Sequence, residues 1–213
     1  MNATRAELRK LLTLPSLRRT ALLTWAATVL LTYAYASAES RGDRLGDNAA
    51  LGPLGYTQAG FLVLGVLAAT SEYQEGDQIR TTLLAMPRRL PLEAAKALAL
   101  AALTLPVAAA TAATSTLPAD GAGWTAGATG YLTLTTLLAA AVGSVVRSAV
   151  SAAILLLGLY FVAGPLLRAG STASAAYLPD TAALDPSHGA AATIAWTFGA
   201  LILAALTFRR RDA

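Results

Sequence analysis

Residues 127–167 read GATGYLTLTTLLAAAVGSVVRSAVSAAILLLGLYFVAGPLL, and Arg147 is the one charged side chain among them. The hydrocarbon core of a bilayer is about 30 Å thick, which an α-helix crosses in about 20 apolar residues. The stretch therefore predicts two membrane-spanning helices, 127–146 and 149–167, joined by a short turn at Arg147.

Four further stretches meet the same requirement, at 20–38, 54–71, 97–116 and 190–208. Apolar residues make up 55% of the 213 positions and charged residues only 13%, whereas about 25% of a soluble domain is charged. A soluble enzyme or nucleic-acid binder is therefore not expected. We expect an all-α polytopic membrane protein with six transmembrane helices in a single transmembrane domain, 1–213.

Lys and Arg are divided unequally between the two sides that six spans create. One side holds 13 of them: Arg5, Arg9, Lys10, Arg18, Arg19, Arg80, Arg88, Arg89, Lys96, Arg147, Arg209, Arg210 and Arg211. The other side holds three: Arg41, Arg44 and Arg168. Because basic loops resist translocation, both termini are predicted to be cytoplasmic. Basic flanks that contact membrane lipids explain the net charge of +4 without a nucleic-acid partner.

No ionisable side chain lies inside any of the six predicted spans. Proton-coupled and sodium-coupled carriers depend on such side chains, so energy for any transport is expected from outside the membrane. The hydroxyls that stand out, such as Thr24, Thr28 and Thr133, are typical of helix packing. Gly127, Gly130 and Gly143 are candidate positions for a close approach between the fourth span and a neighbour.

Two prolines fall within predicted spans and are expected to disturb the helices there. Pro106 in the third span removes a backbone hydrogen bond and predicts a kink. Pro165, which follows Gly164, is expected to bend or end the fifth span near its outer face.

The segment that precedes the first span has an amphipathic pattern over residues 3–14. Leu8, Leu11 and Leu12 recur at helical spacing, and the basic residues Arg5, Arg9 and Lys10 are expected on the other faces. This pattern predicts a helix at the membrane interface that ends at Pro15.

The loop 72–93 between the second and third spans contains the pattern of one further short helix. Gly76 breaks the preceding helix, Asp77 is a favourable N-cap and Pro87 is a stop, which predicts a helix over 77–86. Ile79, Thr82, Leu83 and Met86 form an apolar stripe on it, with Arg80 on another face. Ten residues are marginally helical alone, so the stripe is expected to dock against another surface.

The run SEYQEGDQIRTTL at 71–83, followed by Pro87, Arg88, Arg89 and Lys96, resembles the first cytoplasmic loop of bacterial ABC transporter permeases of the type 2 exporter class. In these permeases, the segment that leaves the second span is similar to Glu72, Tyr73 and Gly76 of this chain. The coupling helix to the ATPase matches Ile79, Arg80, Leu83 and Met86. The segment that re-enters the membrane before the third span is similar to Pro87, Arg88 and Lys96. At the position of Asp77, members of the family often have Thr.

The resemblance implies a transmembrane permease subunit in the bacterial plasma membrane that exports a cargo. Its partners would be a separate cytoplasmic ATP-binding cassette ATPase subunit and a second permease subunit, of the same or a different chain. No G-x-x-x-x-G-K-[ST] motif occurs, so ATP and Mg would be bound by the partner. The chain itself is expected to hold no cofactor or metal and to be no enzyme. Uncharged spans favour an amphipathic or hydrophobic substrate.

Two other functions remain open from the sequence. A six-span substrate-binding component of an uptake system has a similar size, and a non-transporting membrane immunity protein could share the topology. A membrane enzyme would need convergent polar groups, whereas the single histidine, His188, lies in a loop. That loop, 168–189, resembles the region where the exporters carry re-entrant helices near the outer mouth.

Overall fold

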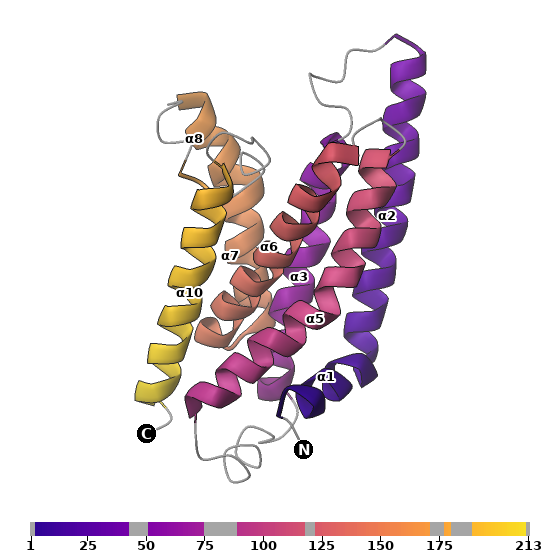
Figure 1. Cartoon of the computed structure of the whole chain (residues 1–213). Helices are drawn as coiled ribbons and strands as arrows, with labels where there is room; N and C mark the ends of the chain where they lie inside the picture. Colours follow the sequence, from indigo (N-terminus) through magenta and orange to yellow (C-terminus); the bar gives the residue numbers. More distant parts are fainter. Residues whose placement is uncertain are drawn as a thin grey trace.

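The computed structural model describes residues 3–42, 51–74, 89–117, 122–170, 177–179 and 189–211. These residues form helices and connections, with no strand among them (Figure 1). In chain order the helices are α1 (Ala3–Thr13), α2 (Pro15–Ser40), α3 (Gly52–Gln74), α5 (Arg89–Thr116), α6 (Thr125–Val146), α7 (Ala149–Gly158), α8 (Gly164–Gly170) and α10 (Gly189–Arg211). A 3₁₀ turn, η2 (Ala122–Trp124), precedes α6, and a π-helical turn, η3 (Leu159–Ala163), joins α7 to α8.

The predicted all-α, six-span architecture is confirmed by six helical segments that are long and apolar enough to cross a membrane. They are α2, α3, α5, α6, α10 and the continuous segment from α7 to α8. Several helices extend beyond the predicted spans: α2 begins at Pro15 rather than 20, and α5 at Arg89 rather than 97. Hydropathy marks the lipid-crossing part of a helix, whereas the helix itself continues into the headgroup layer, where charged side chains are tolerated.

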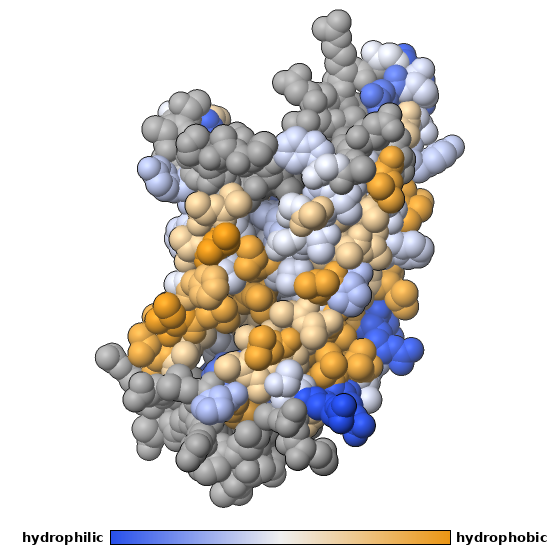
Figure 2. Space-filling view, in the orientation of Figure 1, coloured by the Kyte–Doolittle hydropathy of each residue, from blue (hydrophilic) through white to orange (hydrophobic). Residues whose placement is uncertain are grey.

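The start of α1 and the end of α10 lie at the same end of the bundle, which we call the terminal end (Figure 1). The end of α3, the start of α5 and the turn between α6 and α7 lie there as well. On the face drawn in Figure 2, apolar side chains gather over the middle of the bundle and hydrophilic side chains toward its ends. This distribution is the one that a multi-pass membrane protein requires.

Helix α6 is the centre of the bundle and packs against α3, α5, α7 and α10. The approach to α3 is close because Gly65 has no side chain: a Cβ atom there would collide with the carbonyl oxygen of Thr136 and with Ala139. Gly143 lies on the same contact, where a Cβ would be 3.4 Å from the backbone of Val66. Small residues thus bring the two helices together.

The expectation that Gly127 and Gly130 also mediate a close approach is wrong for the described parts of the bundle, because a Cβ at either position would meet no described neighbour within 4 Å. The sequence shows glycines but not which side of a helix faces a neighbour. The second close contact instead lies between α2 and α3, where Gly60 receives the side chain of Thr24.

Threonine hydroxyls inside the bundle mostly bond to the carbonyl four residues earlier in their own helix. Thr28 donates to Thr24, Thr70 to Val66 and Thr136 to Leu132, at 2.8–2.9 Å. Such bonds satisfy the hydroxyl locally, as helix packing requires. One amide also lies inside a span: Gln58 of α3 is buried and accepts a hydrogen bond from the hydroxyl of Tyr131 on α6. Hydroxyl groups are therefore not the sole polar side chains buried within the spans.

The two prolines occupy different helical settings. Pro106 lies inside α5, which remains one helix from Arg89 to Thr116 and bends along its length in Figure 1. Pro165 is the second residue of α8, two residues after the π-helical turn ends at Ala163, and the amide of Gly164 between them donates to the carbonyl of Leu159. Because proline has no N–H and crowds the carbonyl four residues earlier, a wider turn next to it fits this position. The two kinks themselves stay predictions.

Candidate functional site at the terminal end

Two of the residues that resemble the exporter loop lie in the last turn of α3, Glu72 and Tyr73. The predicted coupling helix 77–86 lies outside the described residues. The same holds for the other residues of the proposed coupling site: Gly76, Ile79, Arg80, Leu83, Met86, Pro87 and Arg88. The structure describes both flanks of this loop, α3 and α5, and both reach the terminal end (Figure 1). The coupling helix therefore stays a prediction, and the structure describes the two helices that flank it, α3 and α5.

Tyr73 contacts the turn between α6 and α7. The guanidinium carbon of Arg147 lies over the tyrosine ring, 5.2 Å from its centroid, within the range of a cation–π interaction. Arg147 ends α6 in the left-handed conformation, with φ 59°, and its amide donates to the carbonyl of Gly143 at 2.8 Å. The sequence showed Arg147 as a turn residue, but it carried no signal for the contact with Tyr73.

Helix α1 matches the predicted helix 3–14 to within one residue. Its apolar side packs partly on the bundle: Leu11 is buried and Leu8 packs against the same cluster, while Leu12 stays half exposed. Lys10 does not face away from the bundle as expected but lines a pocket beside α5. The helix therefore lies against α5 and the start of α2, and its place at the membrane interface stays a prediction.

This pocket, which we call the terminal pocket, lies among α1, α3, α5, α6 and α10 and has a volume of about 80 Å³. Its polar wall consists of Glu7, Lys10, Tyr73, Glu93, Lys96 and Ser144. Its apolar wall consists of Leu11, Ala68, Ala69, Ala97, Leu100, Leu137, Ala140, Ala141, Leu201 and Ala204. Alanines predominate because bulkier side chains would fill the space.

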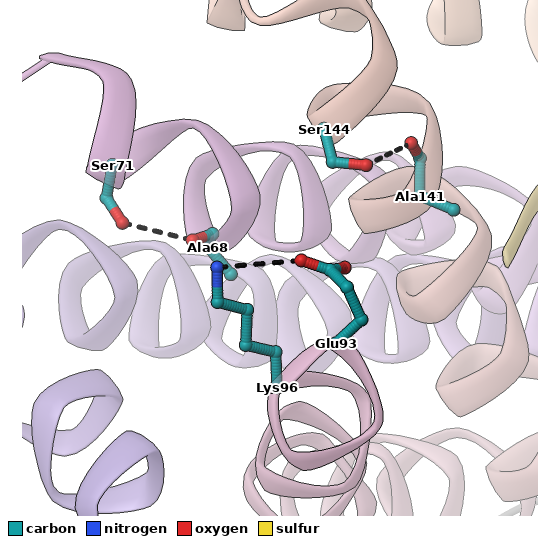
Figure 3. Close-up of polar contacts among 6 residues, drawn as sticks. All are labelled: Ala68, Ser71, Glu93, Lys96, Ala141 and Ser144. Atoms are coloured by element: carbon teal, nitrogen blue, oxygen red, sulfur yellow. Dashed lines mark hydrogen bonds and ion pairs between the residues drawn. The ribbon is translucent and has the colours of Figure 1, made fainter. Parts of the chain in front are cut away.

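Two charged side chains of α5 form an ion pair within this wall. Lys96 Nζ lies 3.7 Å from Glu93 Oε1, and both side chains are about one-fifth exposed, at 21% and 23%. Figure 3 shows the pair beside Ala68 of α3 and Ala141 of α6. Ser71 and Ser144 donate to the carbonyls of Ala68 and Ala141, at 3.0 and 2.8 Å. The site therefore combines charges of both signs with an apolar interior, which suits binding of an amphiphile.

Sequence reasoning missed the terminal pocket. Lys96 was expected to mark the return of the chain to the membrane, and Glu93 to end the loop. The two residues are three apart on a helix, so they lie on one face of it. This spacing was the signal in the sequence that could have indicated the polar wall of the pocket. The alanines of the pocket come from four separate helices, α3, α5, α6 and α10, and meet only in the fold. Within the described parts of the chain, no group of three or more His, Asp or Glu residues could hold a metal ion.

The outer loop 168–189 is described only at its start and over 177–179. Arg168 to Gly170 complete α8, and the carbonyl of Tyr177 accepts a hydrogen bond from Trp196 Nε1 of α10 at 2.8 Å. The expected re-entrant helices and His188 fall on residues that the structure does not describe. No protein family, curated protein or solved structure matches the chain.

Proposed function

We propose that this protein is the transmembrane permease subunit of a bacterial ABC exporter, driven by a separate ATPase subunit. The observation that carries the proposal is the run at 71–83, which resembles the coupling loop of type 2 exporters. The arrangement of its flanks supports it: the end of α3, the start of α5, α1 and the end of α10 share one end of the bundle (Figure 1). A cytoplasmic subunit docked there would reach all of them.

The Tyr73–Arg147 contact gives the proposed loop a mechanical link to other spans. Tyr73 lies one residue before the described end of α3 at Gln74, and Arg147 lies between α6 and α7. In the proposed mechanism, closure of the ATPase subunits displaces the coupling helix 77–86. That displacement moves the end of α3 and, through Tyr73, the turn between α6 and α7. Glu72 and Gly76 would form the pivot between helix and loop.

The terminal end would face the cytoplasm and the opposite end the outside of the plasma membrane. Basic residues at the terminal end include Arg5, Arg9, Lys96 and Arg147, whereas Arg41 and Arg168 lie toward the other end. This asymmetry follows the positive-inside rule. A second permease subunit would complete the transport path, and the uncharged spans favour an amphipathic or hydrophobic substrate.

The proposal is tested by purifying the tagged chain from its native membrane and assaying ATP hydrolysis. We expect a copurifying subunit that contains a Walker A motif and a vanadate-sensitive ATPase activity. An uptake component would instead bring down a transmembrane partner together with ATPases and retain a small-molecule ligand. An immunity protein would copurify with no ATPase, and either result would replace the present proposal.

A further inference from the structure

The polarity of the terminal pocket changes along the bundle axis. Glu93 and Lys96 lie in the first two turns of α5, and Tyr73 lies near the end of α3, so these polar groups are close to the terminal end. Leu100 lies further along α5, and Leu137 is two turns from the end of α6. The pocket is therefore charged toward the terminal end and apolar toward the middle of the membrane.

Among the residues that the structure describes, the charged groups of the pocket are two acids and two bases. Glu7 and Lys10 come from α1, and Glu93 and Lys96 from α5. A ligand with only negative charge would be repelled by the two carboxylates, and one with only positive charge by the two ammonium groups. A ligand that carries both charges is complementary to all four. The Lys96–Glu93 pair spans 3.7 Å and joins residues three apart on one helix, so charges of both signs lie side by side on the wall that α5 contributes.

The size of the pocket limits what enters it. A volume of about 80 Å³ accommodates several water molecules but is well below that of sites for whole drug-sized ligands. The pocket therefore suits one part of a longer molecule, the headgroup and the first methylene groups. The remaining chain would follow the apolar side of the bundle.

From this polarity, charge and size we propose that the terminal pocket binds the headgroup of a zwitterionic phospholipid of the phosphoethanolamine type. The phosphate would pair with Lys96 and Lys10, and the ammonium group with Glu93 and Glu7. The first methylene groups would lie toward Leu137. This orientation matches a lipid in the adjacent leaflet, whose headgroup lies at the interface and whose chains point to the midplane. The proposal holds whether or not the protein is an ABC permease.

Binding can be measured by protection of a single cysteine, because the native chain has none. Ala69 lines the pocket and is half buried, so Ala69→Cys reports on its occupancy. The full chain in detergent is treated with a small methanethiosulfonate reagent in the presence of lysophosphatidylethanolamine, lysophosphatidylglycerol or free phosphoethanolamine. We expect lysophosphatidylethanolamine to slow the reaction about tenfold at a concentration where the other two have little effect. Ser40→Cys, exposed at the other end of α2, should show no protection.

Variants of α5 separate pocket binding from general adsorption of lipid. Ala97→Leu fills the pocket, whereas Ala94→Leu adds the same side chain three residues earlier at an exposed position. Lys96→Gln removes one of the charges that pair with phosphate. Native mass spectrometry should show about tenfold weaker retention of lysophosphatidylethanolamine in Ala97→Leu and Lys96→Gln, and wild-type retention in Ala94→Leu. Each variant is first required to elute as a monodisperse species.

Three results would overturn the proposal. Equal protection by the zwitterionic and anionic lysolipids would mean that the charges do not select the headgroup. Protection by free phosphoethanolamine at the same concentration would mean that the apolar wall of the pocket contributes nothing to lipid binding. An Ala69→Cys variant that does not react even without lipid would mean that the pocket is closed. Loss of ATPase copurification would affect the proposed transport function and leave this binding result unchanged.

Discussion

The guanidinium group of Arg147 lies over the ring of Tyr73, 5.2 Å from its centroid, and so joins the turn after α6 to the end of α3. A cation–π interaction contributes about 0.5–1 kcal/mol at exposed sites and up to about 2 kcal/mol when desolvated. The same arginine occupies the left-handed region, at φ 59°, which costs an L-residue roughly 1 kcal/mol more than glycine. At Arg147, the cation–π contact therefore stabilises the fold, whereas the left-handed backbone conformation destabilises it.

Substitutions at Arg147 therefore have a predicted order. Arg147→Ala loses the ring contact and keeps the strained backbone, so it should lower the free energy of unfolding by about 1 kcal/mol. Arg147→Gly loses the same contact but relieves the backbone, so it should be less harmful. Thermal unfolding in detergent measures both, and a Tyr73→Leu background should remove most of the Arg147→Ala effect. Equal stability of the Ala and Gly variants would contradict this account.

The contact between α3 and α6 depends on Gly65. Gly65→Ala places a Cβ against the backbone oxygen of Thr136, which cannot move aside without separating the helices. We expect a loss of about 1–3 kcal/mol in stability. Gly127→Ala is the matched control, because that site is open and alanine is the better helix former by about 1 kcal/mol. A Gly65→Ala variant as stable as the wild type in thermal unfolding would show that the helices do not pack this closely.

Two adjacent threonines of α6 differ in hydrogen bonding. Within the part of the chain that the structure describes, the buried Thr135 hydroxyl has no hydrogen-bond partner, whereas Thr136 donates to the carbonyl of Leu132 at 2.9 Å. Valine has the same shape without the hydroxyl, so Thr135→Val should stabilise the protein by about 1 kcal/mol. Thr136→Val should be neutral or slightly destabilising. The reverse order of melting temperatures would indicate an ordered water at Thr135.

The sequence predicts the fold well because lipid imposes one requirement on every span, about 20 apolar residues in a helix. That requirement located all six membrane-spanning segments, and the helical spacing of Leu8, Leu11 and Leu12 located α1. Hydropathy does not tell which face of a helix meets a neighbour, so it could not distinguish Gly65, which packs against α6, from Gly127, where an added Cβ would meet no described neighbour. The terminal pocket stayed hidden for the same reason: its lining residues come from five helices.

The orientation of the bundle can be tested independently of its partners. Thr4→Cys in α1 and Ser40→Cys at the end of α2 lie at opposite ends. In intact cells, a membrane-impermeant maleimide should label Ser40→Cys at once and Thr4→Cys only after permeabilisation. Labelling of Thr4→Cys in intact cells would reverse the orientation and place the proposed coupling loop outside.

The central claim is that residues 77–86 couple this chain to an ATPase subunit, and a pair of substitutions tests it most directly. Leu83→Asp puts a carboxylate on the apolar stripe of the predicted helix, whereas Thr81→Asp puts it on another face. A buried unpaired charge costs several kcal/mol, so ATPase copurification should fall sharply for Leu83→Asp and stay near the wild-type level for Thr81→Asp, with both variants inserted normally. Undiminished ATPase association and transport in Leu83→Asp would contradict the claim.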